Sequence, residues 1–338
     1  MTNTAFSFGE AASAFTTLAG VRFPIVQAPM GGASCPELAA AVSEAGGLGM
    51  LALSWHSPDA VRAEIRATRA LTKQPFAVNL VLAFPQEERL AVCLEEGVGL
   101  VSFFWGNCAP LVRRVHDAGA LVASTVATAE DAIAATDAGV DIIVAQGWEA
   151  GGHVRGQVAT LPLTAAVTAA LPGRVVLAAG GVGDGRGVAS MLALGAGGVW
   201  MGTRFLASPE ASIHRRYRER LVAARESDTV HTDLFNVGWP DAPHRVLRNS
   251  TIAAWDDAGR PAVGLRPGEG EVLAVGSRGR MVRYASTTPG PDADGDIEAL
   301  SLWAGQSVGC VAKVKPAGDI VRELVEDAAA ALRRVAPT

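Results

Sequence analysis

The sequence predicts an eight-stranded parallel α/β barrel of the (β/α)8 type, with a smaller domain inserted near its carboxyl end. A short apolar run, a polar or glycine-containing turn and an alanine-rich amphipathic stretch recur along residues 24–202. Continuous apolar strands that alternate with helices are typical of a parallel sheet covered on both faces. The recurrence yields eight strands, which favours closure into a barrel, and a hydrophobic content of 49% supplies a large core.

Eight short apolar runs are the predicted strands. They cover residues 24–28, 48–53, 75–80, 100–104, 120–126, 141–146, 175–180 and 198–202. Most of the helical segments between them end at a glycine that suits a helix C-terminus, as in EAGG, EEGVG, DAGA, DAGVD and ALGAGG. A doubly wound open sheet is the alternative fold. It calls for a G-x-G-x-x-G turn after the first strand, which QAPMGGAS does not supply.

The pattern changes after the eighth strand. Ser208 is the predicted N-cap of a charge-rich helix that begins at Pro209. Residues 228–300 are rich in Gly, Pro and Asp, and we expect the segment TTPGPDADGD within them to be an exposed loop. Residues 316–335 form an amphipathic helix that suits the last position of the barrel. The predicted boundaries are 1–208 and 301–338 for the barrel and 209–300 for the inserted domain.

Composition and charge narrow the class of protein. A net charge of −5 and the lack of a basic cluster give no attraction for nucleic acid or anionic lipid. The longest uncharged stretches are too short to span a membrane, and residues 1–15 lack the pattern of a secretory signal. We therefore expect a soluble, cytoplasmic protein without nucleic-acid or membrane partners. The four cysteines are too scattered for a zinc site or a disulfide framework, so we expect no metal.

Glycines follow the last two predicted strands. Gly180 and Gly181 end the seventh strand, and Gly202 and Thr203 end the eighth. In barrels the loops after these two strands often form a phosphate site, because free backbone N–H groups point at one spot. Glycine lets a phosphate reach the main chain, and the Thr203 hydroxyl adds a donor. The alternative is that these glycines only make turns.

Polar residues end three other strands. Gln27 to Met30 follow the first strand, Asn79 ends the third, and Gln146 ends the sixth. Each side chain could instead hydrogen-bond a nearby loop. Together, at one mouth of a barrel, they suit an amide-rich surface that binds a heterocycle with alternating donors and acceptors.

His153 follows the sixth strand in the segment VAQGWEAGGHVRG. Its neighbours Gly151 and Gly152 have no side chains, so we expect the imidazole to face a bound ligand and to titrate near neutral pH. A structural or capping histidine is the alternative.

Other candidate groups are weaker. We expect His116 in an outer helix, His214 in the charged helix, and the remaining histidines, His56, His231 and His244, in polar loops. No Ser-His-Asp grouping or Gly-x-Ser-x-Gly elbow is present, so hydrolysis lacks its usual signal. Cys35 has two readings: a redox thiol near the barrel mouth or, more simply, a small buried cysteine at the start of a helix.

Several motifs, in order, resemble the nitronate monooxygenase family, formerly called 2-nitropropane dioxygenases. They are PIVQAPMGG, PFAVNL, QGWEAGGH, AAGGV, GVWMGTRFL and LWAGQSVG, and the resemblance spans most of residues 21–335. It implies an FMN-dependent TIM barrel with an inserted smaller domain. The implied reaction is oxidation of an alkyl nitronate, or of a nitroalkane, by dioxygen to a carbonyl compound and nitrite.

The same resemblance implies roles for the candidate residues. His153 would face the substrate and either abstract a proton from a nitroalkane or orient the nitronate. Phe104, Trp148 and Trp303 are candidates to line the substrate pocket. The resemblance also implies which residues bind FMN: Ala28, Pro29, Met30, Asn79, Gln146, Gly151, Gly180, Gly181, Gly202 and Thr203. Of these, Gly180, Gly181, Gly202 and Thr203 would hold the phosphate.

Two other functions stay open at this point. The Glu-Ala-Gly-Gly-His element also occurs in NAD(P)H-dependent FMN reductases that act on quinones or enoyl thioesters, and such barrels need no Rossmann fingerprint. A barrel that binds FMN without turnover is the third reading. The expected partners are a small nitronate or nitroalkane and dioxygen, and the sequence leaves a homodimer open.

Overall fold

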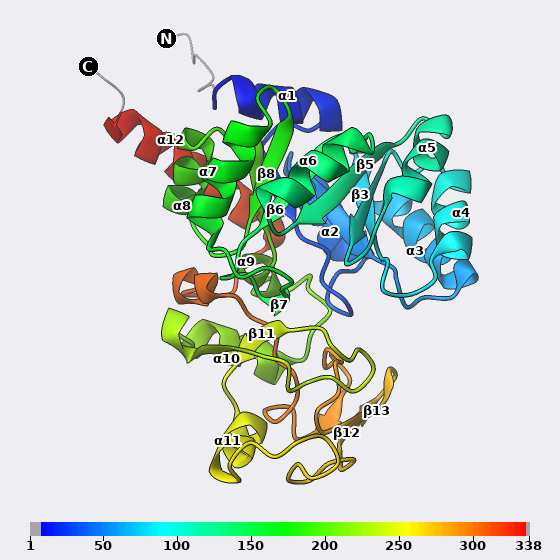
Figure 1. Ribbon diagram of the computed structural model, residues 1–338, viewed down its shortest axis with the longest axis vertical. Coiled ribbons are helices and arrows are strands. Elements are labelled where there is room, and N and C mark those ends of the chain that lie inside the picture. Colours follow the sequence, from blue (N-terminus) through cyan, green and yellow to red (C-terminus); the bar gives the residue numbers. More distant parts are fainter. Residues whose placement is uncertain (1–7, 336–338) are drawn as a thin grey trace.

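The computed structural model describes residues 8–335. Figure 1 shows a β/α barrel with its helices around it and a smaller lobe beside one end of the barrel. Residues 1–7 and 336–338 lie outside the described part. The first of these ranges begins the stretch that lacks a secretory-signal pattern.

Eight parallel strands form the barrel. They are β1 (Ile25–Gln27), β2 (Gly49–Ala52), β3 (Phe76–Val81), β4 (Leu100–Phe104), β5 (Leu121–Val126), β6 (Ile142–Gln146), β8 (Val175–Ala179) and β9 (Gly198–Met201). Their order in the sheet is β1-β9-β8-β6-β5-β4-β3-β2. A parallel bridge between Val26 and Leu48 joins the two ends. The predicted barrel is therefore confirmed, with each strand placed within one residue at either end, and the open-sheet alternative is wrong.

Apolar side chains fill the barrel interior. Met50, Leu100, Val144 and Leu177 point inward and are buried. Phe15 from helix α1 (Glu10–Ala19) belongs to the same cluster and is fully buried, so α1 closes one end of the barrel. Since helices cover the outside, both faces of each strand are buried, which explains the continuous apolar runs in the sequence.

Eight helices surround the strands. They are α2 (Pro36–Glu44), α3 (Pro58–Leu71), α4 (Glu87–Glu95), α5 (Ala109–Asp117), α6 (Ala129–Asp137), α7 (Thr160–Ala170), α8 (Gly185–Ala193) and α12 (Ala317–Val335). Helix α12 lies against α8 and α2, so it fills the last position of the ring, as predicted. A short helix, α9 (Thr203–Leu206), follows β9.

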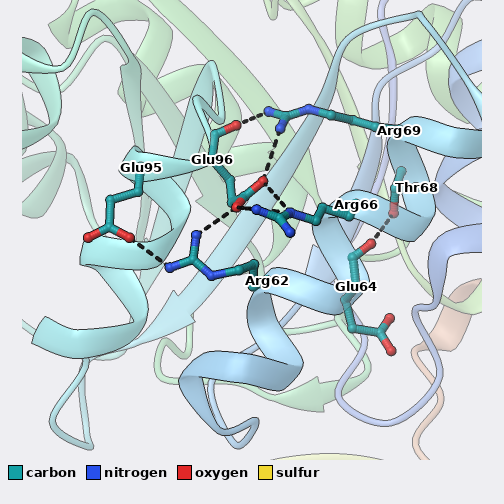
Figure 2. A network of polar contacts seen from close by, with 7 residues as sticks. All are labelled: Arg62, Glu64, Arg66, Thr68, Arg69, Glu95 and Glu96. Carbon is teal, nitrogen blue, oxygen red and sulfur yellow. Dashed lines mark hydrogen bonds and ion pairs between the residues drawn. The ribbon is translucent and has the colours of Figure 1, made fainter.

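An ion-pair network on the outer surface joins α3 to the end of α4 (Figure 2). Arg62 reaches both Glu95 and Glu96, and Arg66 reaches Glu96 at 2.9 Å. Arg69 adds a third guanidinium to Glu96, through its carboxylate and its carbonyl. Hydrogen bonds from Arg66 and Arg62 lower the pKa of Glu96. None of these residues is a candidate site residue, and we assign the network to holding two neighbouring helices together.

A second lobe follows α9 and precedes α12 in the chain, and its bounds of 209–300 stay a prediction. Its elements are α10 (Arg215–Ala223), η1 (Glu226–Asp228), β10 (Thr229–Thr232), β11 (His244–Leu247), α11 (Ser250–Asp257), β12 (Val272–Gly276), β13 (Gly279–Val282), β14 (Asp294–Gly295) and η2 (Gln306–Cys310). One of its sheets has the order β10-β11-β7, and strand β7 (Gly152–His153) comes from the barrel loop after β6. The residue predicted to be catalytic is therefore also part of a sheet of the lobe.

Three expectations for the lobe are wrong. The charged helix begins at Arg215 rather than Pro209, and His214 caps it by accepting from the Arg216 N–H at 3.0 Å. Ser208 is fully buried and donates to the Phe205 carbonyl at 2.8 Å, so it belongs to the turn after α9.

The segment TTPGPDADGD is exposed only in its second half, because Thr288, Pro289 and Gly290 are buried against the barrel end. His231 and His244 lie in strands β10 and β11 rather than in loops. These short strands pair with each other and with β7, and such pairing leaves no periodic pattern in the local sequence.

Candidate active site

A cavity of about 470 Å³ opens at the carboxyl ends of the barrel strands, between the barrel and the second lobe. Its size lies within the roughly 300–1,000 Å³ that small-molecule sites occupy. Gln27 is fully buried and lies outside the cavity lining. All the residues predicted to bind FMN line the cavity, and so does His153: Ala28, Pro29, Met30, Asn79, Gln146, Gly151, His153, Gly180, Gly181, Gly202 and Thr203. The fold thus brings them together, while their individual roles stay predictions.

The ends of β8 and β9 form a cradle of main-chain donors. Gly180 and Gly181 have φ values of 97° and 70°, a region that side chains disfavour. Within residues 8–335, their backbone N–H groups have no hydrogen-bond acceptor. The Thr203 hydroxyl accepts from the Gly305 N–H at 2.9 Å, which leaves its own proton to donate. Such a set of N–H and O–H donors fits a phosphate group.

Gly202 completes the cradle on the side of β1. A Cβ built there would lie 3.6 Å from the Met30 sulfur and 3.7 Å from the Ala28 Cβ, and would meet no closer atom. A side chain would therefore fit the fold but would project toward the cavity wall formed by residues 28–30. The cradle depends on the absence of a side chain at this position.

Two amide side chains also line the cavity, Asn79 from β3 and Gln146 from β6. Asn79 donates through Nδ2 to the Ser102 carbonyl at 3.2 Å, and Gln146 donates through Nε2 to the His153 carbonyl at 3.2 Å. The alternative expected from the sequence, a hydrogen bond to a nearby loop, thus holds for Gln146. Both side chains also line the cavity, where their carbonyl oxygens remain as acceptors.

The loop after β6 is held from three sides. The Glu149 carboxylate accepts from the Thr160 N–H at 2.7 Å and from its hydroxyl at 2.9 Å, which fixes the start of α7. Arg245 of the lobe donates to the Trp148 carbonyl at 3.0 Å and lies over its ring at 4.1 Å. A Cβ at Gly151 would lie 2.3 Å from the Gly305 nitrogen, so close packing requires this glycine.

Aromatic candidates are placed unequally. Phe104 and Trp303 line the cavity as expected, but Trp148 does not, because it lies under Arg245. The sequence shows Arg245 only as one of many cations in an irregular segment. Nothing local marks it as a buried residue that is 1% exposed.

His153 is held by the lobe in one tautomer. Its Nδ1 lies 3.1 Å from the Ala242 carbonyl, and its Nε2 lies 3.2 Å from the Ser286 hydroxyl. A carbonyl oxygen only accepts, so Nδ1 carries the proton and Nε2 of the neutral ring keeps its lone pair. His244 donates to the same carbonyl at 2.9 Å and accepts from the Phe235 N–H at 3.2 Å. One carbonyl therefore orients both imidazoles.

Burial keeps the His153 ring neutral. Loss of solvent, followed by the nearby His244, lowers the pKa of His153 to about 3, and burial lowers the pKa of His244 to about 4. Trp239 lies over His153 with ring centroids 3.9 Å apart, and Trp303 lies at 5.3 Å. The expectation of a group that titrates near neutral pH is thus wrong, because burial disfavours the charged imidazole.

The lobe supplies cavity residues that the sequence did not reveal. Trp239, Ser286 and Thr288 line the cavity, and so does Arg278. Arg278 donates to the Thr288 carbonyl at 3.1 Å and to the Ser212 carbonyl at 3.0 Å. Among the described residues that line the cavity, Arg278 carries the only full charge at neutral pH. The cavity therefore favours an anionic ligand.

The remaining candidates lie outside the reacting region. Cys35 precedes α2, and burial raises the pKa of its thiol to about 12, so it is not a reactive thiolate. His116 pairs with Asp141 on the outer surface. Within residues 8–335, no three His, Cys, Asp or Glu side chains are grouped to hold a metal ion, and none of the helices is long and apolar enough to cross a membrane.

Comparison with known proteins identifies the family. A family model described as nitronate monooxygenase matches residues 12–88 and 81–327. The chain belongs to the nitronate monooxygenase family. A Pseudomonas aeruginosa protein named nitronate monooxygenase is 35% identical over an alignment of 365 positions, gaps included. The alignment covers 93% of this chain and 98% of the relative.

Two solved structures resemble this chain to about the same degree. Nitroalkane oxidase from Streptomyces ansochromogenes has 31% identity and a TM-score of 0.78, over 96% of this chain and 100% of that one. FabK from Thermotoga maritima has 32% identity and a TM-score of 0.78, over 95% of this chain and 97% of that one. The protein is an oxidoreductase of a flavin-dependent family, as the resemblance implied.

Proposed function

We propose that the protein oxidises alkyl nitronates with dioxygen, using FMN, and forms a carbonyl compound and nitrite. The observation that supports this most is the placement of His153. Its unprotonated Nε2 accepts from the Ser286 hydroxyl, and both residues line the cavity that also contains the cradle and a single guanidinium, Arg278. Family membership agrees with this reaction class.

The cradle is the proposed site of the FMN phosphate, bound by the N–H groups of Gly180 and Gly181 together with Gly202 and Thr203. Asn79, Gln146, Gly151 and residues 28–30 would lie along the rest of the cofactor. A bound FMN would supply the electron-transfer chemistry between substrate and dioxygen. The chain itself binds, orients and moves protons.

The role of His153 depends on which form of the substrate binds. With a neutral nitroalkane, Nε2 takes the carbon-bound proton, and the Ala242 carbonyl stabilises the resulting cation through Nδ1–H. With a preformed nitronate no proton needs to leave carbon, and the neutral ring, whose Nε2 has no proton to donate, only packs beside the anion. The Arg278 guanidinium would attract this anion to the cavity. Ser286 holds the imidazole until the substrate takes its place.

A second candidate function is an NAD(P)H-dependent FMN reductase that acts on quinones or enoyl thioesters. The specific observation in its favour is that FabK matches as well as nitroalkane oxidase does, at the same TM-score. The lone Arg278 in the cavity is compatible with an anionic thioester as well.

Steady-state assays separate the two candidates. The purified FMN-loaded protein is given ethyl nitronate or nitroethane in air, and oxygen uptake and nitrite are measured. In parallel it receives NADH or NADPH with a benzoquinone or with crotonyl thioester. We expect oxygen uptake matched by nitrite in the first assay and no nicotinamide oxidation in the second. Rapid nicotinamide oxidation without nitrite production would contradict the proposal.

A further inference from the structure

Five aromatic side chains gather on one side of the cavity. We call Trp55, Phe84, Phe104, Trp105 and Trp239 the aromatic wall. Trp239 is at its centre, with ring centroids 5.4 Å from Trp105, 5.5 Å from Phe84, 6.0 Å from Trp55 and 6.5 Å from Phe104. The rings meet at interplanar angles of 57–77°, which is edge-to-face packing.

The strand order places this wall across the barrel from the cradle. Trp55, Phe84 and Phe104 come from the ends of β2, β3 and β4 or the loops just after them. In the closed ring, β3 and β4 lie opposite β8 and β9, which carry the cradle. A ligand anchored by phosphate at the cradle therefore reaches toward the wall.

The wall also adjoins His153. Trp239 lies over the imidazole with centroids 3.9 Å apart, and Trp105 meets its edge at 6.0 Å. If His153 acts on the reacting carbon, a substituent on that carbon points along the wall. The wall therefore belongs to the substrate side of the site.

The wall is apolar where it meets the cavity. Trp55, Phe104 and Trp239 line the space, together with Val81 and Val237. None of these side chains carries a charge. This part of the cavity thus suits a substituent that is itself apolar.

Trp55 stands at the rim of the wall and is 52% exposed, although it is the bulkiest of side-chain types. Its ring would lie 3.1 Å from a Cβ at Gly31, so the rim is narrow there. Trp105, a member of the wall that does not line the cavity, has a φ of 59°, which is rare for a bulky residue and marks a constrained position next to a site.

We propose that the aromatic wall is a subsite for an aromatic substituent, so that the preferred substrates are arylalkyl nitronates rather than small alkyl nitronates. This inference rests on the proposed function. Tilted rings along the cavity offer edges and faces to a planar ring, and such contacts exceed the gain from apolar burial alone. An unbranched alkyl chain would gain only the burial.

Phenylacetate and acetate test the subsite without turnover. Each carboxylate is a planar anion with two oxygens, as a nitronate is, and neither is oxidised. Their affinities for the oxidised holoenzyme are measured by titration calorimetry. We expect phenylacetate to bind at least about tenfold more tightly than acetate, a difference of about 1.4 kcal/mol.

Trp55 is the residue to substitute, because its exposure lets the fold survive the change. Trp55→Ala should weaken phenylacetate about tenfold and leave acetate unchanged, while Trp55→Phe should restore most of the affinity. Trp255→Ala is the matched control, since Trp255 lies in α11 of the lobe and lines no part of the cavity. It should change neither affinity.

Three results would overturn the inference. One is equal binding of the two carboxylates by the unaltered protein. Another is an equal effect of Trp55→Ala on both. The third is loss of FMN from Trp55→Ala, which would assign the wall to the cofactor. Because binding is measured without turnover, these results are independent of whether nitronate oxidation itself is observed.

Discussion

The two sides of the cavity are built in different ways. On the barrel side, the ends of β8 and β9 present mainly backbone N–H groups around Gly180, Gly181 and Gly202. On the lobe side, contact is through side chains such as Trp239 and Ser286. His153 lies between them, in a barrel loop that pairs with a strand of the lobe.

This difference separates two tasks. Main-chain donors can hold a common group such as a phosphate whatever side chains surround it, so the barrel side suits a cofactor that many relatives share. Side chains from the lobe set the tautomer, the hydration and the neighbours of His153. We therefore expect barrel-side changes to affect cofactor retention and lobe-side changes to affect turnover.

Replacing the residue between the two sides should have the largest effect. His153→Ala removes the base and should lower kcat/KM for nitroethane about 10²- to 10⁴-fold while FMN stays bound. Steady-state oxygen uptake and flavin absorbance after gel filtration measure the two quantities.

The matched control for that variant is His116→Ala, which removes an imidazole from the outer helix α5. It should leave kcat/KM unchanged. Full activity in His153→Ala would remove His153 from the reaction, and loss of flavin from it would make the histidine part of the cofactor site instead.

The barrel side is tested by adding a side chain. Gly202 has a negative φ and space for a Cβ, so Gly202→Val should fold. Its methyl groups should block the cradle and weaken FMN binding about 100-fold, a cost of about 2.7 kcal/mol. Fluorescence titration of the apoprotein with FMN gives the dissociation constant.

Gly99→Val provides the comparison, because a Cβ there meets nothing within 4 Å and Gly99 does not line the cavity. Unaltered FMN affinity in the Gly202 variant, with normal unfolding, would mean that the phosphate lies elsewhere.

The lobe side should also make stability depend on pH. His153 and His244 have folded pKa values of about 3 and about 4, both below the ordinary 6.5. The unfolded chain therefore takes up protons first as the pH falls, so the stabilisation is full above about pH 6.5 and is lost below it. At about pH 5 each histidine should cost about 2 kcal/mol of unfolding free energy.

Urea unfolding at about pH 7.5 and about pH 5 checks this expectation. His244→Gln removes one of the histidines with a lowered pKa and should reduce the loss by about 2 kcal/mol, whatever its effect at the higher pH. An unchanged pH dependence in that variant would show that His244 is accessible to protons in the folded protein.

The smallest expected effect is at Ser286. Ser286→Ala removes one hydrogen bond to His153 Nε2, which we expect to lower kcat/KM about threefold to tenfold. FMN affinity should stay the same, since the residue belongs to the lobe side. A larger change in FMN affinity than in turnover would break the division between the two sides.

The barrel and its cradle could be predicted because their signals are local. Each strand is a continuous apolar run, and the cradle residues follow their strands directly, as Gly180 and Gly181 do after β8. The barrel topology then brings Asn79 and Gln146 to the same mouth without further information.

The lobe could not be predicted in the same way. Trp239, Arg278 and Ser286 come from irregular segments whose positions depend on tertiary contacts, such as the Arg278 bonds to Ser212 and Thr288. The pKa expected for His153 was wrong for the same reason. The low pKa comes from burial of the ring, and Trp239, which packs on it, is distant in sequence.

The central claim is that His153 and the cradle serve nitronate oxidation by FMN. Anaerobic stopped-flow absorbance tests it directly, with the yellow holoenzyme mixed separately with ethyl nitronate and with NADH or NADPH. We predict rapid bleaching of the flavin by the nitronate and no bleaching by either nicotinamide. In His153→Ala, bleaching by the nitronate should be unchanged, whereas bleaching by nitroethane, tested in the same way, should be slower than in the unaltered protein. Fast bleaching by NADH or NADPH, with none by the nitronate, would contradict the claim and identify the protein as a nicotinamide-dependent reductase.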